Sequence, residues 1–212
     1  MAGQVEAEVK VRCAHAEALM AAHPELGWRV AEARHFEDNF VFELPGEAMA
    51  RRGSILRLRV VEGRATLTYK GLLPESLTSE MKVREELETG VERPEVLRQV
   101  LERLGLRCSF RYQKYRTVYR LASPEGEALA MRDETPMGEF LEIEGEEAVV
   151  GALARRLGFG PSDFINTSYI GMQAEHCRSR GVPLEDLVFG GRGPGAGARP
   201  DGLPAPESSQ GN

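Results

Sequence analysis

The chain has 212 residues, enough for one ordinary domain or two small ones, and 42% of them are hydrophobic against 28% charged. This composition excludes a collagen-like or wholly disordered chain, and no apolar run approaches the roughly 18 residues that a membrane-spanning helix needs. The lack of such a run predicts a soluble protein that spans no membrane, and the net charge of -6 argues against general nucleic-acid binding through bulk attraction.

Alternation of apolar and polar residues predicts eight strands. In chain order they are 5–11, 36–44, 55–61, 65–71, 81–88, 110–121, 127–133 and 140–144. Helical periodicity predicts four helices, at 14–26, 94–105, 146–158 and 167–180. The pattern therefore predicts an α+β domain whose sheet is mostly antiparallel.

The last stretch, 190–212, is dense in Gly and Pro and carries almost no large apolar side chain. We expect it to be a disordered tail that follows a single domain over residues 1–189. The sequence holds no Walker-type loop, and the glycines of this stretch follow no strand and open no helix. Any phosphate must therefore be bound by side chains.

The cysteines are Cys13, Cys108 and Cys177, an odd number with no close pair. This spacing predicts neither a disulfide framework nor a zinc knuckle, and we expect buried free thiols. The first residues are charged from residue 6 onward and lack the apolar stretch of a secretory signal. We therefore expect a cytoplasmic protein.

Acidic pairs recur at corresponding places along the chain, each on a predicted strand that leads into an amphipathic helix. The pairs are Glu6 with Glu8, Glu86 with Glu88, and Glu142 with Glu144. We interpret them as a repeated strand–helix unit that positions an acidic pair each time. Chance in a Glu-rich chain is the alternative.

Residues i and i+2 of a strand share a face, so the predicted strands each have one apolar and one charged face. On a single strand, a salt-bridged face in water would be the simpler interpretation. Recurrence on six strands favours a site. Its basic groups are Lys10, Arg57, Arg59, Lys70, Arg84, Lys114 and Arg116, and its acidic groups are the three pairs above.

If this face closed into a barrel, these charges would line the lumen. Unpaired buried ions cost several kcal/mol each, which together would exceed a stability of roughly 5–15 kcal/mol, so the lumen must hold water and ligands. An oligophosphate with a divalent metal would satisfy both signs of charge. Because the acidic groups offer oxygen and no His or Cys is interleaved, we expect Mg²⁺ or Mn²⁺ rather than Zn²⁺.

The segment Glu6-x-Glu8-x-Lys10 resembles the ExExK signature of the CYTH superfamily. These triphosphate tunnel metalloenzymes include class IV adenylate cyclases, thiamine triphosphatases and inorganic triphosphatases. Further motifs follow in the family's order across about residues 4–175. They are LRLR with Arg57 and Arg59, LTYKG with Lys70, KVREELE with Arg84 and Glu86, QKYRTVY with Lys114 and Arg116, RDETPMGEFLEIE with Asp133, Glu142 and Glu144, and the late pair Ser168-Tyr169.

The resemblance implies an eight-stranded antiparallel closed barrel that forms a tunnel, with helices outside, and a metal-dependent reaction at a triphosphate. The implied metal ligands are Glu6, Glu8, Asp133, Glu142 and Glu144. The implied substrate-binding residues are Lys10, Arg57, Arg59, Lys70, Arg84, Lys114 and Arg116. Glu86 and Lys10 are the expected catalytic residues, with Glu86 either a metal ligand or a base that orients water.

One feature departs from the family pattern. Some hydrolases of the superfamily use a Lys on the C-terminal helix to help activate water, whereas this sequence has no Lys after Lys114. Arg155, Arg156 or the metal alone would have to replace it, or the reaction differs.

Phosphoryl transfer at such a site allows two reactions. We favour hydrolysis of inorganic triphosphate, thiamine triphosphate or a nucleoside triphosphate, because the acidic set is complete and the pair Arg57 and Arg59 suits a bare triphosphate. The alternative is a class IV adenylate cyclase that converts ATP to cyclic AMP and pyrophosphate. A non-catalytic polyphosphate-binding module is the third hypothesis, although binding alone would not need every acidic position.

Overall fold

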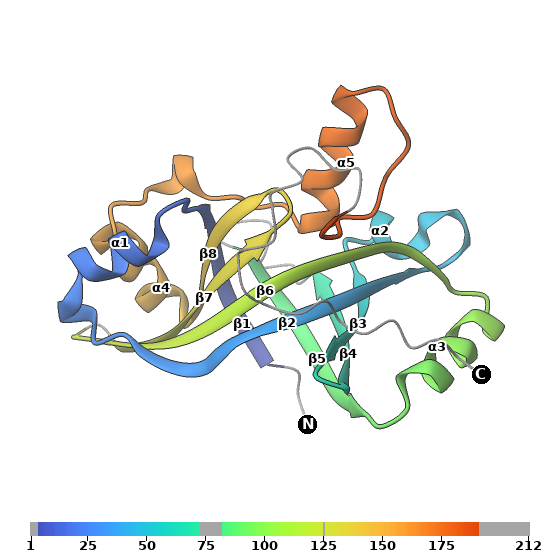
Figure 1. Ribbon diagram of the computed structural model, residues 1–212, viewed down its shortest axis with the longest axis horizontal. Helices are drawn as coiled ribbons and strands as arrows, with labels where there is room; N and C mark the ends of the chain where they lie inside the picture. Colours follow the sequence, from blue (N-terminus) through green and yellow to red (C-terminus); the bar gives the residue numbers. More distant parts are fainter. Residues whose placement is uncertain (1–3, 73–81, 125, 191–212) are drawn as a thin grey trace.

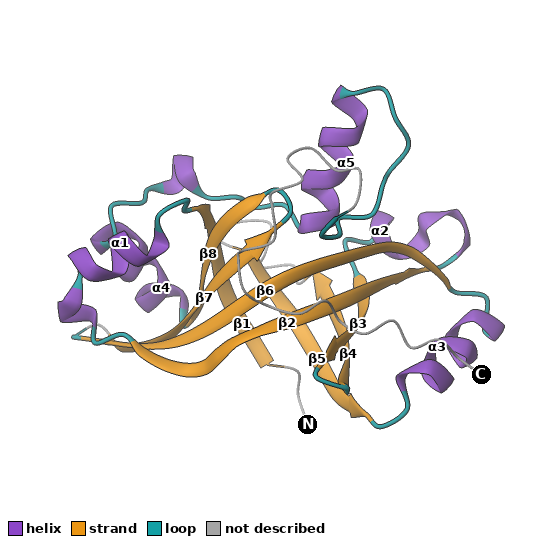
Figure 2. Ribbon diagram, in the orientation of Figure 1, coloured by secondary structure: helices purple, strands orange, loops and turns teal. Residues whose placement is uncertain are grey.

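The computed structural model describes residues 4–72, 82–124 and 126–190, without the side chains of residues 4–6, 72 and 82–84. Figure 1 shows the chain from its N-terminal strand to its last helix, and Figure 2 separates strands from helices. The strands are β1 (Gln4–Arg12), β2 (Arg29–Glu43), β3 (Ile55–Val61), β4 (Arg64–Leu72), β5 (Lys82–Val91), β6 (Arg107–Ser123), β7 (Gly126–Thr135) and β8 (Gly138–Gly145). The α-helices are α1 (Ala16–Ala22), α2 (Ala48–Arg51), α3 (Pro94–Arg103), α4 (Glu147–Arg156) and α5 (Tyr169–Ser179).

Each predicted strand and each of the four predicted helices is confirmed. The largest difference is β2, which begins at Arg29 and not at residue 36. Its first residues are exposed, so they lack the apolar alternation of a half-buried strand, yet they pair with β6 over Arg29 to His35. The short helix α2 was not predicted.

The strands form one antiparallel sheet, as expected. β1 pairs with β5 on one side and with β8 on the other. The hydrogen-bonded order therefore runs β1-β5-β4-β3-β2-β6-β7-β8 and returns to β1. The long strands β2 and β6 lie side by side and extend beyond the others (Figure 1). This order brings the N-terminal strand next to the last one.

The hairpin between β3 and β4 has a two-residue turn at Glu62 and Gly63. Both residues have positive φ, 48° and 78°, as a type I′ turn requires. This turn keeps the register that places Arg57 opposite Thr68 and Arg59 opposite Thr66. It therefore fixes which residues of β4 lie beside the two arginines, which share one face of the sheet because they are two residues apart on β3.

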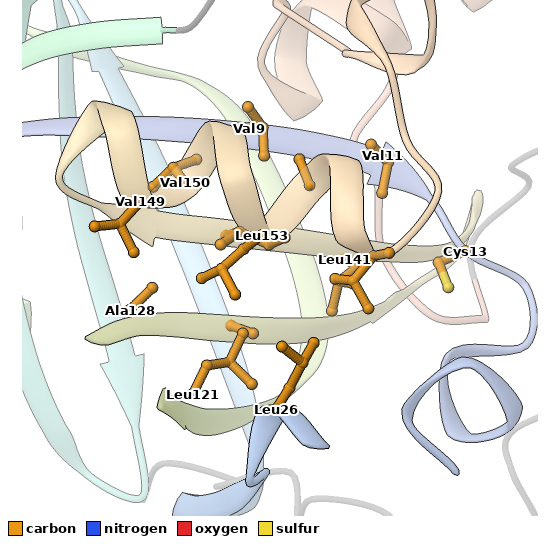
Figure 3. Close-up of a cluster of buried hydrophobic side chains, with 14 of the residues drawn as sticks. Val9, Val11, Cys13, Leu26, Leu121, Ala128, Leu141, Val149, Val150 and Leu153 are labelled. Atoms are coloured by element: carbon orange, nitrogen blue, oxygen red, sulfur yellow. The ribbon is translucent and has the colours of Figure 1, made fainter. Parts of the chain in front are cut away.

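Helix α4 covers the outer face of β1, β7 and β8 (Figure 3). Val150 and Leu153 point from the helix toward Val9, Leu141 and other strand residues, and all of these side chains are buried. A one-residue slip of β1 or β8 would turn this apolar set away from the helix. The apolar outer face therefore determines that the alternate residues, which carry the charges, face inward.

Two further apolar clusters complete the core. Leu101 of α3 packs with Phe42 and Leu58 on the outer face of β2 and β3. Tyr169 of α5 packs with Phe140 and other residues near the edge of the inner face. Helices α3 and α4 thus cover the outer face, whereas α5 lies at the edge of the inner face. The predicted antiparallel sheet with helices packed against it is confirmed, but one of the helices, α5, is not outside it.

The rest of the chain adds three points. Residues 191–212 of the predicted tail lie outside the described residues. None of the helices that the structure describes is both long enough and apolar enough to cross a membrane. Cys13 and Cys177 are buried free thiols as expected, whereas the free thiol of Cys108 is exposed, because it lies near the start of β6.

Candidate functional site

The inner face of the sheet separates into an acidic wall and a basic wall. Strands β8, β1 and β5, which carry the three acidic pairs, are neighbours in the sheet, and β4, β3, β2 and β6 follow on the far side. We define the acidic wall by Glu8, Glu86, Glu88, Glu142 and Glu144, and the basic wall by Arg57, Arg59, Lys70, Lys114 and Arg116. The strand order therefore gathers groups of each sign that are far apart in the sequence.

At the centre of the acidic wall two carboxylates stand opposite each other. Glu8 of β1 and Glu144 of β8 are direct cross-strand partners. Residues in this relationship have Cβ atoms about 4.5–5.5 Å apart, and like charges placed there destabilise a sheet unless a cation lies close by. Lys10 Nζ, 3.8 Å from Glu8 Oε1, supplies one positive charge beside the pair, and the two carboxylates offer oxygen ligands to a further cation.

Lys10 is a basic side chain that lies among the carboxylates of the acidic wall. It is 3% exposed, and its Nζ lies 3.0 Å from Glu142 Oε1 and 3.8 Å from Glu8 Oε1. Burial alone would lower the pKa of Lys10, but Glu142 and Glu8 outweigh it and raise that pKa. Lys10 is therefore a permanent cation whose position its two acidic neighbours determine.

Asp133 of β7 anchors two bases of the basic wall. It accepts hydrogen bonds from Lys114 Nζ at 2.7 Å, from Arg116 Nε and Nη2 at 2.6 Å each, and from the Tyr169 hydroxyl at 2.8 Å. Arg116 also donates to Glu142. Asp133 and Glu142, both expected to bind metal, are thus engaged with cations, and they hold Lys114 and Arg116 in fixed positions.

Arg57 and Arg59 of β3 lie on the same inner face with incomplete hydrogen bonding. Arg57 donates to the Tyr112 hydroxyl at 3.4 Å and to Thr68 Oγ1 at 3.3 Å. The Nε atoms of both arginines are buried, and no described residue accepts a hydrogen bond from either. Burial and the neighbouring Arg57 lower the pKa of Arg59, so its charged form lacks sufficient anionic surroundings. The pair therefore has donors available for an anion.

Lys70 and Glu86 form a cross-strand ion pair between β4 and β5. Lys70 Nζ lies 2.6 Å from Glu86 Oε2, and both side chains are partly exposed. This pair lies where the basic and acidic walls meet on one side of the inner face. The structure thus brings together one predicted phosphate-binding residue and the predicted water-orienting residue.

Glu37 of β2 is a site residue that the sequence motifs did not reveal. It is completely buried, between Arg59, Lys114 and Arg116 of the basic wall. Asn39, two residues along the same strand, donates to it. The i, i+2 spacing of Glu37 and Asn39 on a predicted strand was the available signal, but a lone acidic residue there resembles an ordinary polar face.

Tyr169, the first residue of α5, closes the edge of the site near Lys10. Its hydroxyl donates to Asp133, and its ring centroid lies 4.3 Å from Lys10 Nζ. The ring also packs against Tyr112 and Phe140 at centroid distances of 5.6 and 5.5 Å. The Ser168-Tyr169 pair singled out in the sequence therefore lies at the site, with Ser168 as the N-cap of the helix.

Two predicted site residues have side chains outside the described part of the structure. These are Glu6, expected to bind metal, and Arg84, expected to bind phosphate. Their backbones are direct partners in the pairing of β1 with β5, and Glu6 shares the parity of Glu8. Their roles remain predictions.

The carboxylates near β1 suit a hard cation by their chemistry. Glu8 and Glu144 offer oxygen, the donor that Mg²⁺ and Mn²⁺ prefer, in the like-charged arrangement described above. Among the side chains that the structure describes, no three His, Cys, Asp or Glu residues are grouped so that they could hold a metal ion. The five-carboxylate ligand set therefore remains a prediction.

Comparison with known proteins points to one family. The family model of the CYTH domain matches residues 4–153. A Methanocaldococcus jannaschii protein named "putative adenylate cyclase" is 26% identical over 140 residues, which cover 66% of this chain and 76% of that protein.

Solved structures agree with this match. A Vibrio parahaemolyticus protein, also named "putative adenylate cyclase", has a TM-score of 0.64 at 21% identity and covers 79% of this chain and 96% of its own. The PH1012 protein of Pyrococcus horikoshii OT3 has a TM-score of 0.59 at 25% identity over 78% of this chain and 98% of its own. A Hippeastrum protein named "putative adenylyl cyclase" has a TM-score of 0.53 at 18% identity over 85% of this chain and 97% of its own. The Vibrio and Hippeastrum proteins, at these identities, show a shared fold.

Proposed function

The chain belongs to the CYTH domain family, and on this premise we propose that it is a metal-dependent phosphohydrolase of a triphosphate substrate. The substrate class is inorganic triphosphate, thiamine triphosphate or a nucleoside triphosphate. It would bind within a tunnel enclosed by the ring of strands, between the acidic and basic walls. The free cysteines suit a reducing compartment, so we place the enzyme in the cytoplasm.

The unpaired donors of Arg57 and Arg59 carry this proposal. A buried donor without an acceptor costs about 1–3 kcal/mol, and more when it is charged, so a folded protein seldom keeps one without a ligand to accept from it. Phosphate oxygens are strong acceptors for guanidinium groups and would also restore the charge balance around Arg59. Two such arginines on one strand suit a ligand with more than one phosphate.

The other bases are positioned before any substrate arrives. Lys114 and Arg116 are fixed by Asp133, and Lys10 by Glu142. Groups that do not reorganise during a reaction stabilise developing charge more effectively than mobile ones. Phosphoryl transfer depends mainly on such positioning and neutralisation, so this array would bind the phosphate chain and stabilise the negative charge of the departing group.

The acidic wall would hold the cation and orient the nucleophile. Glu8 and Glu144, with Glu6 on the same strand, are the residues that would hold Mg²⁺ or Mn²⁺. When bound, this ion neutralises phosphate oxygens that the bases do not reach. Glu86 would accept a hydrogen bond from the attacking water, and its ion pair with Lys70 holds its carboxylate at the junction of the two walls. Arg155 and Arg156 are exposed in the last turn of α4, on the outer face of the sheet, so neither would replace a lysine of the C-terminal helix, and the metal alone would have to activate the water.

A class IV adenylate cyclase is the second candidate, and the names of the Methanocaldococcus and Vibrio proteins favour it. Cyclisation of ATP would use the same phosphate-binding array, with the ribose 3′-hydroxyl attacking in place of water. The Hippeastrum protein shares the cyclase name, and a dominant triphosphatase activity is stated for it. That example supports hydrolysis as the first choice.

A substrate panel separates these functions. Purified protein is incubated with tripolyphosphate, thiamine triphosphate or ATP, each with Mg²⁺, with Mn²⁺ or with a chelator. Release of phosphate that the chelator abolishes supports the phosphohydrolase. Formation of cyclic AMP and pyrophosphate from ATP supports the cyclase, and tight binding without any product supports a polyphosphate-binding module.

A further inference from the structure

We propose that Glu37 is an internal counter-anion that occupies the basic wall between turnovers and competes with the phosphate groups of the substrate. Glu37 is a positioning residue in the site proposed above, and the inference rests on that proposed function. Its presence would lower the affinity of the basic wall for phosphate, so that product can leave.

The contacts of Glu37 all come from bases or from a neutral donor. Its Oε1 lies 3.4 Å from Arg59 Nη1 and 3.9 Å from Arg116 Nε, and its Oε2 lies 3.5 Å from Lys114 Nζ. Asn39 Nδ2 donates to Oε2 at 3.4 Å, and His35 Nε2 lies 3.6 Å from Oε1. The carboxylate is therefore placed among the cations that would otherwise face a phosphate.

Glu37 is held more loosely than Asp133. The hydrogen bonds of Asp133 to Lys114 and Arg116 measure 2.6–2.7 Å, whereas no ion pair or hydrogen bond of the Glu37 carboxylate to a described residue is shorter than 3.4 Å. Its Oε1 is buried without a hydrogen-bond partner in that part of the chain. Asp133 thus fixes the bases, while Glu37 neutralises them without binding any one tightly.

The charge of Glu37 is permanent at physiological pH. Burial alone would raise its pKa, but Lys114, Arg116 and Arg59 outweigh burial and hold the pKa well below its usual range. A phosphate oxygen that approached Arg59 or Lys114 would meet a full negative charge beside each. Because like charges repel strongly in a buried site, Glu37 reduces the gain from each phosphate contact.

Binding of tripolyphosphate without metal tests this role, since it does not depend on catalysis. The variants are Glu37→Gln, which keeps the shape and removes the charge, and Glu37→Asp, which keeps the charge. Glu32→Gln is the matched control, because Glu32 is an exposed residue of the same strand. We expect Glu37→Gln to bind tripolyphosphate at least about tenfold more tightly by calorimetry, which is about 1.4 kcal/mol. Glu37→Asp and Glu32→Gln should stay within about threefold of the wild type.

A second variant covers the case in which Glu37→Gln does not fold, because it leaves three bases with less compensation. Arg59→Gln should weaken binding, and the double variant Glu37→Gln/Arg59→Gln should recover at least about tenfold of that loss. The double variant removes one charge of each sign, so the charge balance of the site is retained. No recovery would overturn the inference.

The outcomes separate this inference from the proposed function. If the wild type binds tripolyphosphate and Glu37→Gln binds no more tightly, the role of Glu37 is wrong and the function stands. If the wild type does not bind without metal but Glu37→Gln does, the competing anion is confirmed, and the proposed function fails only if the wild type also releases no phosphate with Mg²⁺ or Mn²⁺. If neither protein binds without metal, the inference is overturned, and the same release assay decides the proposed function.

Discussion

Glu8 and Glu144 face each other directly across the pair formed by β1 and β8, although 135 residues separate them in the chain. Their strands are joined in this register because the next cross-strand pair, Val9 and Ile143, must face α4. Packing on the outer face thus forces two negative charges together on the inner face. A cation between them would turn this unfavourable arrangement into a binding site.

Glu144→Gln should therefore separate function from stability. We expect turnover of a triphosphate to fall by at least about 100-fold, because a metal-binding charge is lost. The free energy of unfolding without metal should change by less than about 1 kcal/mol, since the Glu144 side chain is only partly buried. Steady-state rates and urea unfolding measure the two quantities. Glu127→Gln, an exposed change on β7, is the control, and full turnover in Glu144→Gln would contradict the role of this pair.

Arg59→Gln should weaken binding of tripolyphosphate by about 10- to 100-fold, because a charge-assisted hydrogen bond contributes about 1.5–3 kcal/mol. The dependence of binding on salt should also become shallower, as one cation no longer contributes. Arg64→Gln, an exposed change at the start of β4, should alter neither quantity. Equal affinities of the Arg59→Gln protein and the wild type would remove the basis for the phosphate-binding role of β3.

Tyr169→Phe should reduce the free energy of unfolding by about 1.5–3 kcal/mol, because its hydroxyl donates to the buried carboxylate of Asp133. The ring packing against Phe140 remains, so the fold itself should persist. Thermal and urea unfolding measure the loss. Tyr119→Phe serves as the control, since Tyr119 packs against Trp28 away from the site. A change in the free energy of unfolding below about 0.5 kcal/mol would show that the hydrogen bond from Tyr169 to Asp133 does not stabilise the protein.

Leu153→Ala should destabilise the protein by about 2–5 kcal/mol, because the side chain is completely buried between α4 and the sheet. Val96→Ala on α3, where the side chain is 39% exposed, should cost much less. Activity per folded molecule should stay unchanged in both, as neither residue lies on the inner face. Equal effects of the two changes on unfolding would contradict the packing of α4.

Acid should destabilise the protein through Glu37. Its folded-state pKa is held well below the usual 4.5, so its contribution to stability is present above about pH 4.5 and is lost as the pH falls below that value. Glu37→Gln should therefore show a shallower loss of unfolding free energy between pH 4.5 and about pH 3 than the wild type. Glu32→Gln should keep the wild-type slope. An unchanged slope in Glu37→Gln would refute the buried ion pairs of this carboxylate.

Much of the fold followed from alternation in the sequence. Strands such as β3, with Leu56 and Leu58 on one face and Arg57 and Arg59 on the other, have a strict two-residue period. The exposed start of β2 has no such period, because pairing with β6 and not burial makes it a strand. This exposed part of β2 could not be predicted from the residue pattern of the segment alone.

The candidate site was predictable as a set of charges but not as an arrangement. Parity placed Lys114 and Arg116 on one face, yet their shared partner Asp133 became evident from the pairing of β6 with β7. The grouping of acids and bases on opposite walls depends on strand order, which no local pattern encodes. Glu37 was missed for the same reason, since its meaning comes from neighbours on β3 and β6.

The most direct test of the account is release of orthophosphate from tripolyphosphate by the wild type with Mg²⁺ or Mn²⁺, measured beside the Arg59→Gln and Glu144→Gln variants. The account predicts release by the wild type that a chelator stops, and strongly reduced release by both variants. Absence of release from tripolyphosphate, thiamine triphosphate and ATP, with cyclic AMP formed from ATP instead, would contradict it.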